Sequence, residues 1–495
     1  MSHSNLKEDE KNALKLTLGL GACLNFKHRS KQEVLMMIEI YSPYSNKLVG
    51  TVQALTQDQV NVAIKDAKRA QLAWADLEIY DRAKYLYAWA DELIKMKEEL
   101  ATVVMQEVGK AYLDAIKEVE RTAELIRYTV EEAIHLGGES LNGSHFPGGS
   151  RSKIAIVDRI PLGVILAISP FNYPVNLAAA KIAPALITGN VVIFKPATQG
   201  ALSGVKMIEA LTKTGLPEGV LKVVTGRGSV IGDYLIEHPD INMVSFTGGT
   251  HTGEQIAQKA KMIPMVMELG GKDPAIVCED ADLNLAATQI VTGAYSYSGQ
   301  RCTAIKRVLV HHEVADELLQ LIKTQVEALS VGSPEDNATV VPLIDQGSAD
   351  FVQGLVDDAV AKGADVVVGN KREGNLIYPT LLDGVTPEMR VAWEEPFGPV
   401  LPMIRVHSED EAVRLANESE YGLQASVFTK DIDKALTLAR RLETGSVQIN
   451  GRTERGPDHL PFIGIKKSGL GAQGVRRSIE SMTQEKVTII NVNRD

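Results

Sequence analysis

The sequence predicts an α/β protein that contains a parallel β-sheet covered by helices, followed by a second α/β unit. Between residues 154 and 269, short apolar runs alternate with helical stretches. Such strand-helix-strand repeats imply right-handed crossovers and a parallel sheet with helices on both faces. A second α/β pattern begins near residue 275 and closes near residue 450. The 495 residues are enough for about three structural units of roughly 150 residues each.

A helical region precedes the first unit. From residue 56 to 136, apolar residues such as Leu86, Trp89 and Leu93 recur at helical spacing, with charged residues between them. Residues 38–43 before it have the alternation of a strand that ends in a turn. We interpret residues 1–35, which carry scattered charge and no clear period, as an N-terminal extension.

The strands of the first unit are expected where the apolar runs occur. These runs span residues 163–168, 190–194, 221–224, 243–246 and 265–269. Ligands bind parallel sheets at the carboxyl ends of the strands. Motifs that follow these apolar runs are therefore expected to lie at a ligand-binding edge of the sheet.

The composition excludes several classes of function. Hydrophobic residues make up 44% and charged residues 23% of the chain, which is ordinary for a globular protein. No apolar run approaches the roughly 18 residues of a membrane span. The net charge of −11 argues against nucleic acid or an anionic membrane as the main partner. An anionic substrate would therefore need a local cluster of arginines.

The three cysteines, at positions 23, 278 and 302, predict neither a disulfide framework nor a metal site. They are odd in number and form no Cys-x-x-Cys motif. We therefore expect a reducing, cytoplasmic location. Residues 20–23 are similar to a lipoprotein cleavage box, but the acidic residues at 8–10 and Lys15 do not fit a signal peptide, so we expect no lipidation.

A nucleophile and a base are predicted between residues 267 and 306. Cys302 lies in a small polar loop, and its reactive thiolate would be favoured by the adjacent Arg301. Glu268 ends an apolar run before two glycines and can act as a general base if partial burial raises its pKa. Alone, Cys302 could be an inert buried residue and Glu268 a solvated acid. Together they predict covalent catalysis followed by hydrolysis.

Two segments carry a resemblance to a known family. Residues 268–272 (Glu-Leu-Gly-Gly-Lys) and 299–303 (Gly-Gln-Arg-Cys-Thr) resemble motifs of the aldehyde dehydrogenase superfamily, and further segments resemble its non-phosphorylating, NADP-dependent glyceraldehyde-3-phosphate dehydrogenase branch. The resemblance covers roughly residue 38 to the C-terminus. It implies an aldehyde dehydrogenase-like fold with a Rossmann-type cofactor domain, an α/β catalytic domain and a β-ribbon oligomerisation element.

The resemblance also implies boundaries for these parts. The cofactor-binding domain would comprise residues 36–137 and 156–269, the catalytic domain 270–460, and the bridging ribbon 138–155 and 461–495. The tail at 486–492 is β-rich with little to bury by itself, and an edge strand of this kind invites pairing with another subunit. We therefore predict a homo-oligomer, and a homotetramer from the resemblance.

Lys195 and Thr198 predict NADP as the cofactor. Lys195 ends a strand and can reach the adenosine ribose, although it could also be a surface lysine. Many relatives that prefer NAD carry a glutamate at the position of Thr198, where it would repel a 2′-phosphate. Thr198 removes that charge, while Lys195 supplies an opposite one.

The remaining cofactor contacts are implied by the resemblance. Gly248 and Gly249 join a strand to a helix whose N-terminal amides could receive the pyrophosphate; Gly249 replaces the family's usual serine. Glu395 would hold the nicotinamide ribose, and Phe397 would pack near the nicotinamide ring. Asp233, which follows Gly232 at an expected helix start, is a weaker candidate. The glycine-rich stretch before it, residues 226–232, is only similar to a dinucleotide fingerprint, because its last spacing is one residue too long.

Asn172 matches the family's oxyanion donor. It follows a buried strand, and there a neutral amide can donate a hydrogen bond to a developing oxyanion, together with the backbone N–H of Cys302. In most proteins an asparagine in such a segment only stabilises a turn. No histidine is needed as a base, and no metal is implied.

The substrate is predicted to be a small phosphorylated aldehyde. Arg121, Arg301 and Arg455 match three arginines that surround a substrate phosphate in the branch, with Arg452 as an alternative to Arg455; singly, each would be read as a surface charge. The resemblance also places Ser169, Tyr173 and Thr303 beside the substrate. Together these residues favour oxidation of glyceraldehyde 3-phosphate directly to 3-phosphoglycerate.

Two alternatives remain open from the sequence. The same chemistry could act on another small aldehyde, such as a semialdehyde. The fold could also serve as a catalytically idle binding or structural protein, although the complete set of Cys302, Glu268 and Asn172 argues against it.

Overall fold

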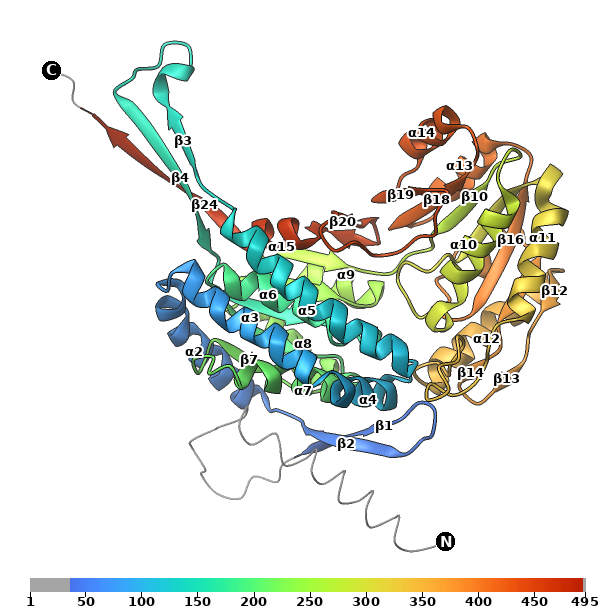
Figure 1. Cartoon of the computed structure of the whole chain (residues 1–495), viewed down its shortest axis with the longest axis horizontal. Coiled ribbons are helices and arrows are strands. Elements are labelled where there is room, and N and C mark those ends of the chain that lie inside the picture. Colours follow the sequence, from blue (N-terminus) through green and yellow to red (C-terminus); the bar gives the residue numbers. More distant parts are fainter. Residues whose placement is uncertain (1–35, 493–495) are drawn as a thin grey trace, which may run out of the picture.

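The computed structural model describes residues 36–492. The predicted N-terminal extension and the lipoprotein-like segment lie outside these residues. Two α/β units stand side by side, and a narrow β-ribbon projects from the first of them (Figure 1). The α/β fold class predicted from the alternating pattern is confirmed. No helix within residues 36–492 combines the length and apolarity that crossing a membrane requires.

The first unit is built on a six-stranded sheet with the order β22-β9-β8-β5-β6-β7. Five strands are parallel, and each coincides with a predicted apolar run to within a few residues. They are β5 (Val164–Ile168), β6 (Val191–Lys195), β7 (Leu221–Val223), β8 (Met243–Thr247) and β9 (Met265–Glu268). The chain moves outward from β5 in one direction to β7 and then returns to β8 on the other side. This reversal creates a crevice at the carboxyl ends of β5 and β8, where dinucleotides bind in sheets of this order.

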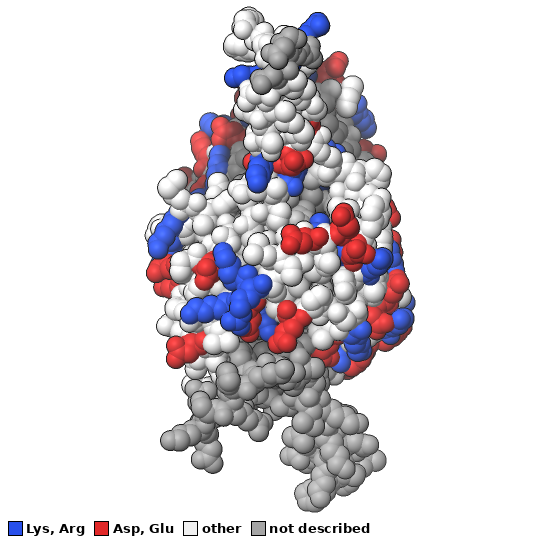
Figure 2. Space-filling model, turned by 90° about the vertical axis from the view of Figure 1, so that its left-hand side faces the viewer, with Lys and Arg blue, Asp and Glu red and all other residues white. Residues whose placement is uncertain are grey.

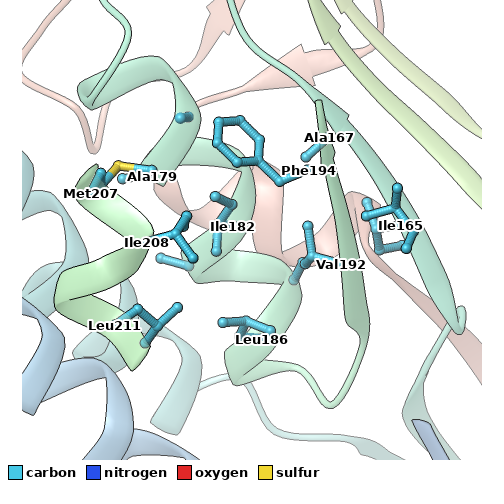
Figure 3. Close-up of a cluster of buried hydrophobic side chains, with 14 of the residues drawn as sticks. Ile165, Ala167, Ala179, Ile182, Leu186, Val192, Phe194, Met207, Ile208 and Leu211 are labelled. Atoms are coloured by element: carbon cyan, nitrogen blue, oxygen red, sulfur yellow. The ribbon is translucent and has the colours of Figure 1, made fainter. Parts of the chain in front are cut away.

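Helices cover both faces of this sheet. Those that follow its strands are α6 (Asn176–Ile187), α7 (Ala201–Thr212), α8 (Gly228–Glu237) and α9 (Thr250–Lys259). The helical spacing of residues 56–136 is confirmed by α2 (Gln57–Ala75), α3 (Ile79–Lys95), α4 (Lys97–Val108) and α5 (Tyr112–Ile134). Figure 3 shows Val192 of the sheet facing Ile182 of α6 and Ile208 of α7, and Ile165 belongs to the same buried cluster. The sequence of α6 is mostly apolar on every side, with Asn176 and Lys181 as exceptions, and this suits a helix that is buried almost along its whole length.

The second unit has a seven-stranded sheet with the order β12-β15-β16-β11-β10-β18-β19. Its strands are β10 (Pro274–Val277), β11 (Arg307–His311), β12 (Asp365–Val368), β15 (Thr380–Asp383), β16 (Val400–Val406), β18 (Gln424–Phe428) and β19 (Ser446–Ile449). Only β12 runs antiparallel to its neighbour. Its helices are α10 (Leu283–Tyr295), α11 (His312–Glu327), α12 (Gln346–Ala361), α13 (Glu409–Asn417) and α14 (Ile432–Arg441).

Short elements complete the chain. The 3₁₀ helices are η2 (Gly143–His145), η3 (Ser296–Gly299) and η4 (Arg390–Ala392). Two-stranded pairs are formed by β1 (Met37–Tyr41) with β2 (Leu48–Gln53), β13 (Arg372–Glu373) with β14 (Leu376–Ile377), β17 (Tyr421–Gly422) with β21 (Ile465–Lys466), and β20 (Phe462–Ile463) with β23 (Ala472–Gln473).

The C-terminal segment is divided between the first unit and the ribbon, whereas the predicted ribbon began at residue 461. Only β24 (Thr483–Asn491) joins the ribbon, where it pairs with β4 (Lys153–Pro161), which in turn pairs with β3 (Glu139–Asn142). The preceding segment belongs to the first unit: β22 (Gly469–Leu470) pairs with β9, and α15 (Val475–Ser481) packs on α5 and α6. The reason is burial, because Val475, Ile479 and Met482 are part of the first hydrophobic core.

Candidate active site

The structure brings Glu268 and Cys302 into contact, although they come from different units. Glu268 is the last residue of β9 in the first unit. Cys302 follows η3 in the second unit. Its Sγ donates a hydrogen bond to Glu268 Oε1 at 3.3 Å. The pair therefore lies where the two units meet, and Glu268 is almost fully buried there.

The loop that carries Cys302 has an unusual backbone. Tyr297 and Ser298 have φ values of 52° and 56°, a left-handed conformation that costs energy in residues with a side chain. Two hydrogen bonds of 2.7 Å between the Ser298 hydroxyl and the backbone of Val341 hold this conformation. Gly299, also at positive φ, packs so closely that a Cβ would lie 2.5 Å from Gly398 O. Contacts with Val341 and Gly398 of the second unit thus hold the loop that carries the nucleophile.

Burial raises the pKa of the Cys302 thiol well above its usual value, and the neighbouring carboxylate of Glu268 raises it further. The cations that oppose this rise are Lys306 and Arg455. Arg301, the residue expected to favour the thiolate, instead donates a hydrogen bond to the carbonyl of Gly293. The expectation was wrong in its residue: Arg301 is held by a backbone carbonyl, and the cations that act on the Cys302 thiol come from positions 306 and 455.

Glu268 differs from expectation in the direction of its pKa. Burial raises the pKa of this carboxyl, as predicted, but Arg455 and Lys181 lower it by more, and the net pKa is below its usual value. Arg455 Nη1 lies 2.5 Å from Glu268 Oε2. The carboxylate is therefore held as an ion pair.

Lys181 was not singled out from the sequence. Its Nζ donates to Thr247 Oγ1 at 2.6 Å, and that hydroxyl donates to Glu268 Oε2 at 3.2 Å. Burial lowers the pKa of Lys181 to about 7. The available signal was a single lysine inside the otherwise apolar helix α6, because a fully buried lysine is rare without a partner.

Asn172 lies beside the nucleophile loop. It is buried in the segment between β5 and α6, and its Nδ2 donates to Gln300 O at 2.8 Å. An amide nitrogen carries two hydrogens, so one remains for a substrate oxygen. This position fits the predicted oxyanion donor.

A cavity of about 420 Å³ opens from Cys302 and Glu268 between the two units. Of the residues predicted to contact substrate, five line it: Arg121, Tyr173, Arg301, Thr303 and Arg455. Ser169 is buried at the end of β5, and its Oγ has no hydrogen-bond partner among the described residues. Arg452, the alternative to Arg455, also lines the cavity. Lys110 and Lys117, which no sequence motif had singled out, also line the cavity.

The arginines of this cavity differ in their partners. Arg121 forms a bidentate ion pair with Asp458, at 2.7 and 2.8 Å. Arg452 pairs with Glu454 at 2.7 Å. Arg301 is 8% exposed, and its Nε is buried without a hydrogen-bond partner within residues 36–492. A buried guanidinium donor without a partner is costly, so Arg301 is ready to receive an anionic group.

The predicted cofactor residues lie at the carboxyl edge of the first sheet. Lys195 ends β6 and is buried, and burial lowers the pKa of its amine to about 8. Within the described part of the chain its Nζ makes only a long hydrogen bond of 3.4 Å, to Pro196 O. Thr198 follows in the adjacent loop, and Gly248 and Gly249 lie between β8 and α9. A Cβ on Gly249 would meet no atom within 4 Å, so the turn before α9 is open.

The three other cofactor candidates have different surroundings. Glu395 accepts a hydrogen bond from Gly271 N at 3.1 Å and pairs with Lys306 Nζ at 2.9 Å. Lys306 also donates to the carbonyl of Cys302, so Glu395 is connected to the nucleophile loop. Phe397 packs edge-on against Phe171, with ring centroids 5.9 Å apart. Asp233 is exposed on α8 and pairs with Lys259 at 2.5 Å.

This fold and this site define a class of enzyme, and the chain belongs to the aldehyde dehydrogenase family, whose model matches residues 29–488. Two similar relatives share one name within this family. The chain is 54% identical over 463 residues to an NADP-dependent glyceraldehyde-3-phosphate dehydrogenase of Streptococcus equinus, covering 94% of this chain and 96% of the relative. It is 50% identical over 457 residues to the enzyme of the same name from Pisum sativum, covering 92% of each.

A solved structure agrees with these relatives. The NADP-dependent glyceraldehyde-3-phosphate dehydrogenase of Bacillus halodurans C-125, complexed with NADP, superposes with a TM-score of 0.92 at 62% identity and covers 92% of this chain and 96% of that one. The predicted family, its aldehyde dehydrogenase-like fold and its NADP-dependent branch are confirmed by these similarities.

Proposed function

We infer that this chain oxidises D-glyceraldehyde 3-phosphate directly to 3-phosphoglycerate with NADP⁺ and water, without inorganic phosphate. The observation that carries the inference is a single cavity that joins Cys302 and Glu268 to Arg121, Arg301 and Arg455. Guanidinium groups suit phosphate because two of their donors point in the same direction. The names of the relatives support the same substrate.

The first half of the reaction depends on Cys302 and Asn172. The Cys302 thiolate adds to the aldehyde carbon, and Asn172 Nδ2 with the Cys302 backbone N–H donates to the resulting oxyanion. NADP⁺, when bound, supplies the hydride acceptor. The carbon is then held as a thioester on Cys302, whose position is fixed by the loop contacts of Ser298 with Val341.

The second half depends on Glu268. Its carboxylate takes a proton from water, and the hydroxide attacks the thioester carbon. The C–S bond breaks, the sulfur leaves as the thiolate, and the acid departs. Glu268 can do this because it lies within contact distance of Cys302 Sγ, at 3.3 Å.

The residues at the edge of the first sheet fit NADP. Lys195 offers a buried amine with almost no other partner, and Thr198 adds no negative charge beside it. The turn at Gly248 and Gly249, open at Gly249, leads into the N-terminus of α9, which suits pyrophosphate. Glu395 would hold the nicotinamide ribose and Phe397 the ring. Asp233 is the weakest of these assignments, since Lys259 already neutralises it.

Replacing Thr198 with glutamate is expected to change the preference from NADP towards NAD. A carboxylate beside Lys195 would repel the 2′-phosphate, so the ratio of kcat/KM for NADP to that for NAD should fall at least about tenfold. The control is Thr198→Gln, which has the size of glutamate without its charge. Equal ratios in the two variants would mean that charge at this position does not select the cofactor.

Replacing Asn172 with alanine is expected to lower kcat by about 10²-fold, because one oxyanion donor is worth about 3 kcal/mol. The measurement is steady-state NADPH formation, with NADP binding as the check on the fold. A variant with normal kcat would show that the contact of Asn172 with Gln300 O is its whole role.

The proposed function is tested by the appearance of NADPH from glyceraldehyde 3-phosphate with inorganic phosphate omitted. We expect NADPH and 3-phosphoglycerate in equal amounts. A panel of other small aldehydes, semialdehydes included, serves as the comparison. If one of them has a higher kcat/KM than glyceraldehyde 3-phosphate, the substrate assignment is wrong even though the chemistry stands.

We also propose that the protein is a homotetramer located in the cytoplasm. The support is β24, an edge strand of the ribbon with Val487 and Ile489 exposed. Figure 2 shows the ribbon above a broad area that carries few charged side chains. Both Cys278 and Cys302 are free thiols, which suits a reducing compartment. Light scattering of pure protein at micromolar concentration should give a mass well above the monomer's 53.7 kDa; a monomer would contradict the proposal.

A further inference from the structure

Arg455 is the residue whose observed contacts conflict with its proposed task. It is assigned to the substrate phosphate, but its Nη1 is bound to Glu268 Oε2 at 2.5 Å and its Nη2 to Gln473 Oε1 at 2.9 Å. Its guanidinium carbon lies 5.0 Å from the centre of the Phe462 ring. Each Nη carries two hydrogens, and one on each is already used, so a phosphate that binds Arg455 competes with Glu268 for the charge of the same guanidinium.

The other two arginines assigned to the phosphate do not have this connection. Arg121 is bound to Asp458, and Arg301 donates to the backbone of Gly293. Among these three, only Arg455 contacts the base. A ligand that binds Arg455 therefore also changes the ion pair of Glu268, and with it the pKa of this carboxyl.

The ion pair makes Glu268 a weak base. Burial alone would raise the pKa of this carboxyl, but Arg455 is the strongest of the influences that lower it, followed by Lys181. If Arg455 turns to another anion, its lowering effect is lost and the pKa of Glu268 rises. A general base is most effective when its pKa is near the working pH, so the released carboxylate is the better base.

We propose that the substrate phosphate draws Arg455 away from Glu268 and thereby frees the carboxylate for hydrolysis of the thioester. Arg455 is then a positioning residue that acts through Glu268, and it makes the second half of the reaction depend on the phosphate. An aldehyde without a phosphate would acylate Cys302, but the resulting thioester would be hydrolysed slowly. This inference rests on the proposed function, and it places part of the substrate specificity in the hydrolysis step.

The first test divides the substrate into two pieces. The full-length enzyme with NADP is mixed with D-glyceraldehyde, and NADPH is followed before and after addition of phosphite dianion. We expect a burst of NADPH followed by slow turnover, and an increase of the slow rate by roughly tenfold or more with phosphite, while the burst amplitude stays the same. Phosphite that raises the burst rate but leaves the slow rate unchanged would overturn the inference.

The second test does not depend on phosphite binding. Arg455→Gln removes the ion pair, so the slow rate with D-glyceraldehyde should show a midpoint on the acid side that is higher than in the natural enzyme by at least about one pH unit. The matched control is Lys117→Gln, which also removes one positive charge from the cavity, but at an exposed residue that pairs with Asp114. An identical midpoint in the natural enzyme and Arg455→Gln would overturn the inference.

The proposed function and the role of Arg455 can be contradicted separately. If glyceraldehyde 3-phosphate without inorganic phosphate gives no NADPH, the proposed function fails. If it gives NADPH at a high rate but neither phosphite nor Arg455→Gln affects hydrolysis, only the role of Arg455 fails. Should Arg455→Gln not fold, the phosphite experiment on the natural enzyme decides.

Discussion

Replacing Cys302 with serine is expected to lower kcat for glyceraldehyde 3-phosphate by at least about 10³-fold, because an activated nucleophile accounts for rate factors of this size or larger. A serine hydroxyl is far less acidic than a thiol and cannot form the thioester. The substitution changes one atom in a loop that is held by Ser298 and Val341, so the fold and NADP binding should be unchanged. The measurement is NADPH formation, with NADP affinity as the control. Substantial remaining turnover would exclude covalent catalysis by this residue.

The pH dependence of the same thiol follows from its surroundings. Burial, and then the charge of Glu268, raise the pKa of Cys302 in the enzyme without ligands, so the thiolate fraction increases as the pH rises. Alkylation of Cys302 by iodoacetamide should therefore be slower at neutral pH than at pH 9. Cys278 serves as an internal comparison, because burial raises its pKa to about 12, and peptide mapping should find it unmodified.

The parts of the site that lie at strand ends were predictable from local sequence. An apolar run followed by polar residues marks the carboxyl end of a parallel strand, and this identified the positions of Lys195 and Glu268 correctly. Periodicity alone could not show that Glu268 meets Cys302, since Glu268 ends a strand of the first unit and Cys302 lies in a loop of the second. That expectation depended on the family resemblance.

The charged partners of the site residues could not be predicted from the sequence. Glu268 was expected to have a raised pKa, but a partner nearly two hundred residues away, Arg455, reverses the direction. Lys306 likewise pairs with the distant Glu395, while its bond to the carbonyl of Cys302 is local. The ion pairs of Glu268 with Arg455 and of Lys306 with Glu395 join segments that only the tertiary fold brings together. The boundary of the tail failed for a related reason, because the burial of α15 against α5 and α6 is a tertiary property.

Replacing Glu268 with glutamine is expected to separate the two halves of the reaction. The amide keeps the shape of the side chain but cannot take a proton from water. Cys302 should still be acylated, giving a burst of about one NADPH per subunit, after which turnover should be lower by about 10²- to 10⁴-fold, the usual contribution of a general base. The burst itself should not be slower than in the natural enzyme, because the carboxylate that raises the pKa of Cys302 is gone.

The matched control is Glu454→Gln, which makes the same substitution at another carboxylate of the cavity, one that pairs with Arg452 rather than with the nucleophile. This variant should show no accumulation of the acyl-enzyme. Both variants are quenched in acid during turnover, and the mass of the protein is measured by mass spectrometry. Only Glu268→Gln should carry the additional mass of a phosphoglyceroyl group on Cys302. A fully active Glu268→Gln enzyme without a burst would mean that another group activates the water, and Lys181, connected to the site through Thr247, would then be the first residue to replace.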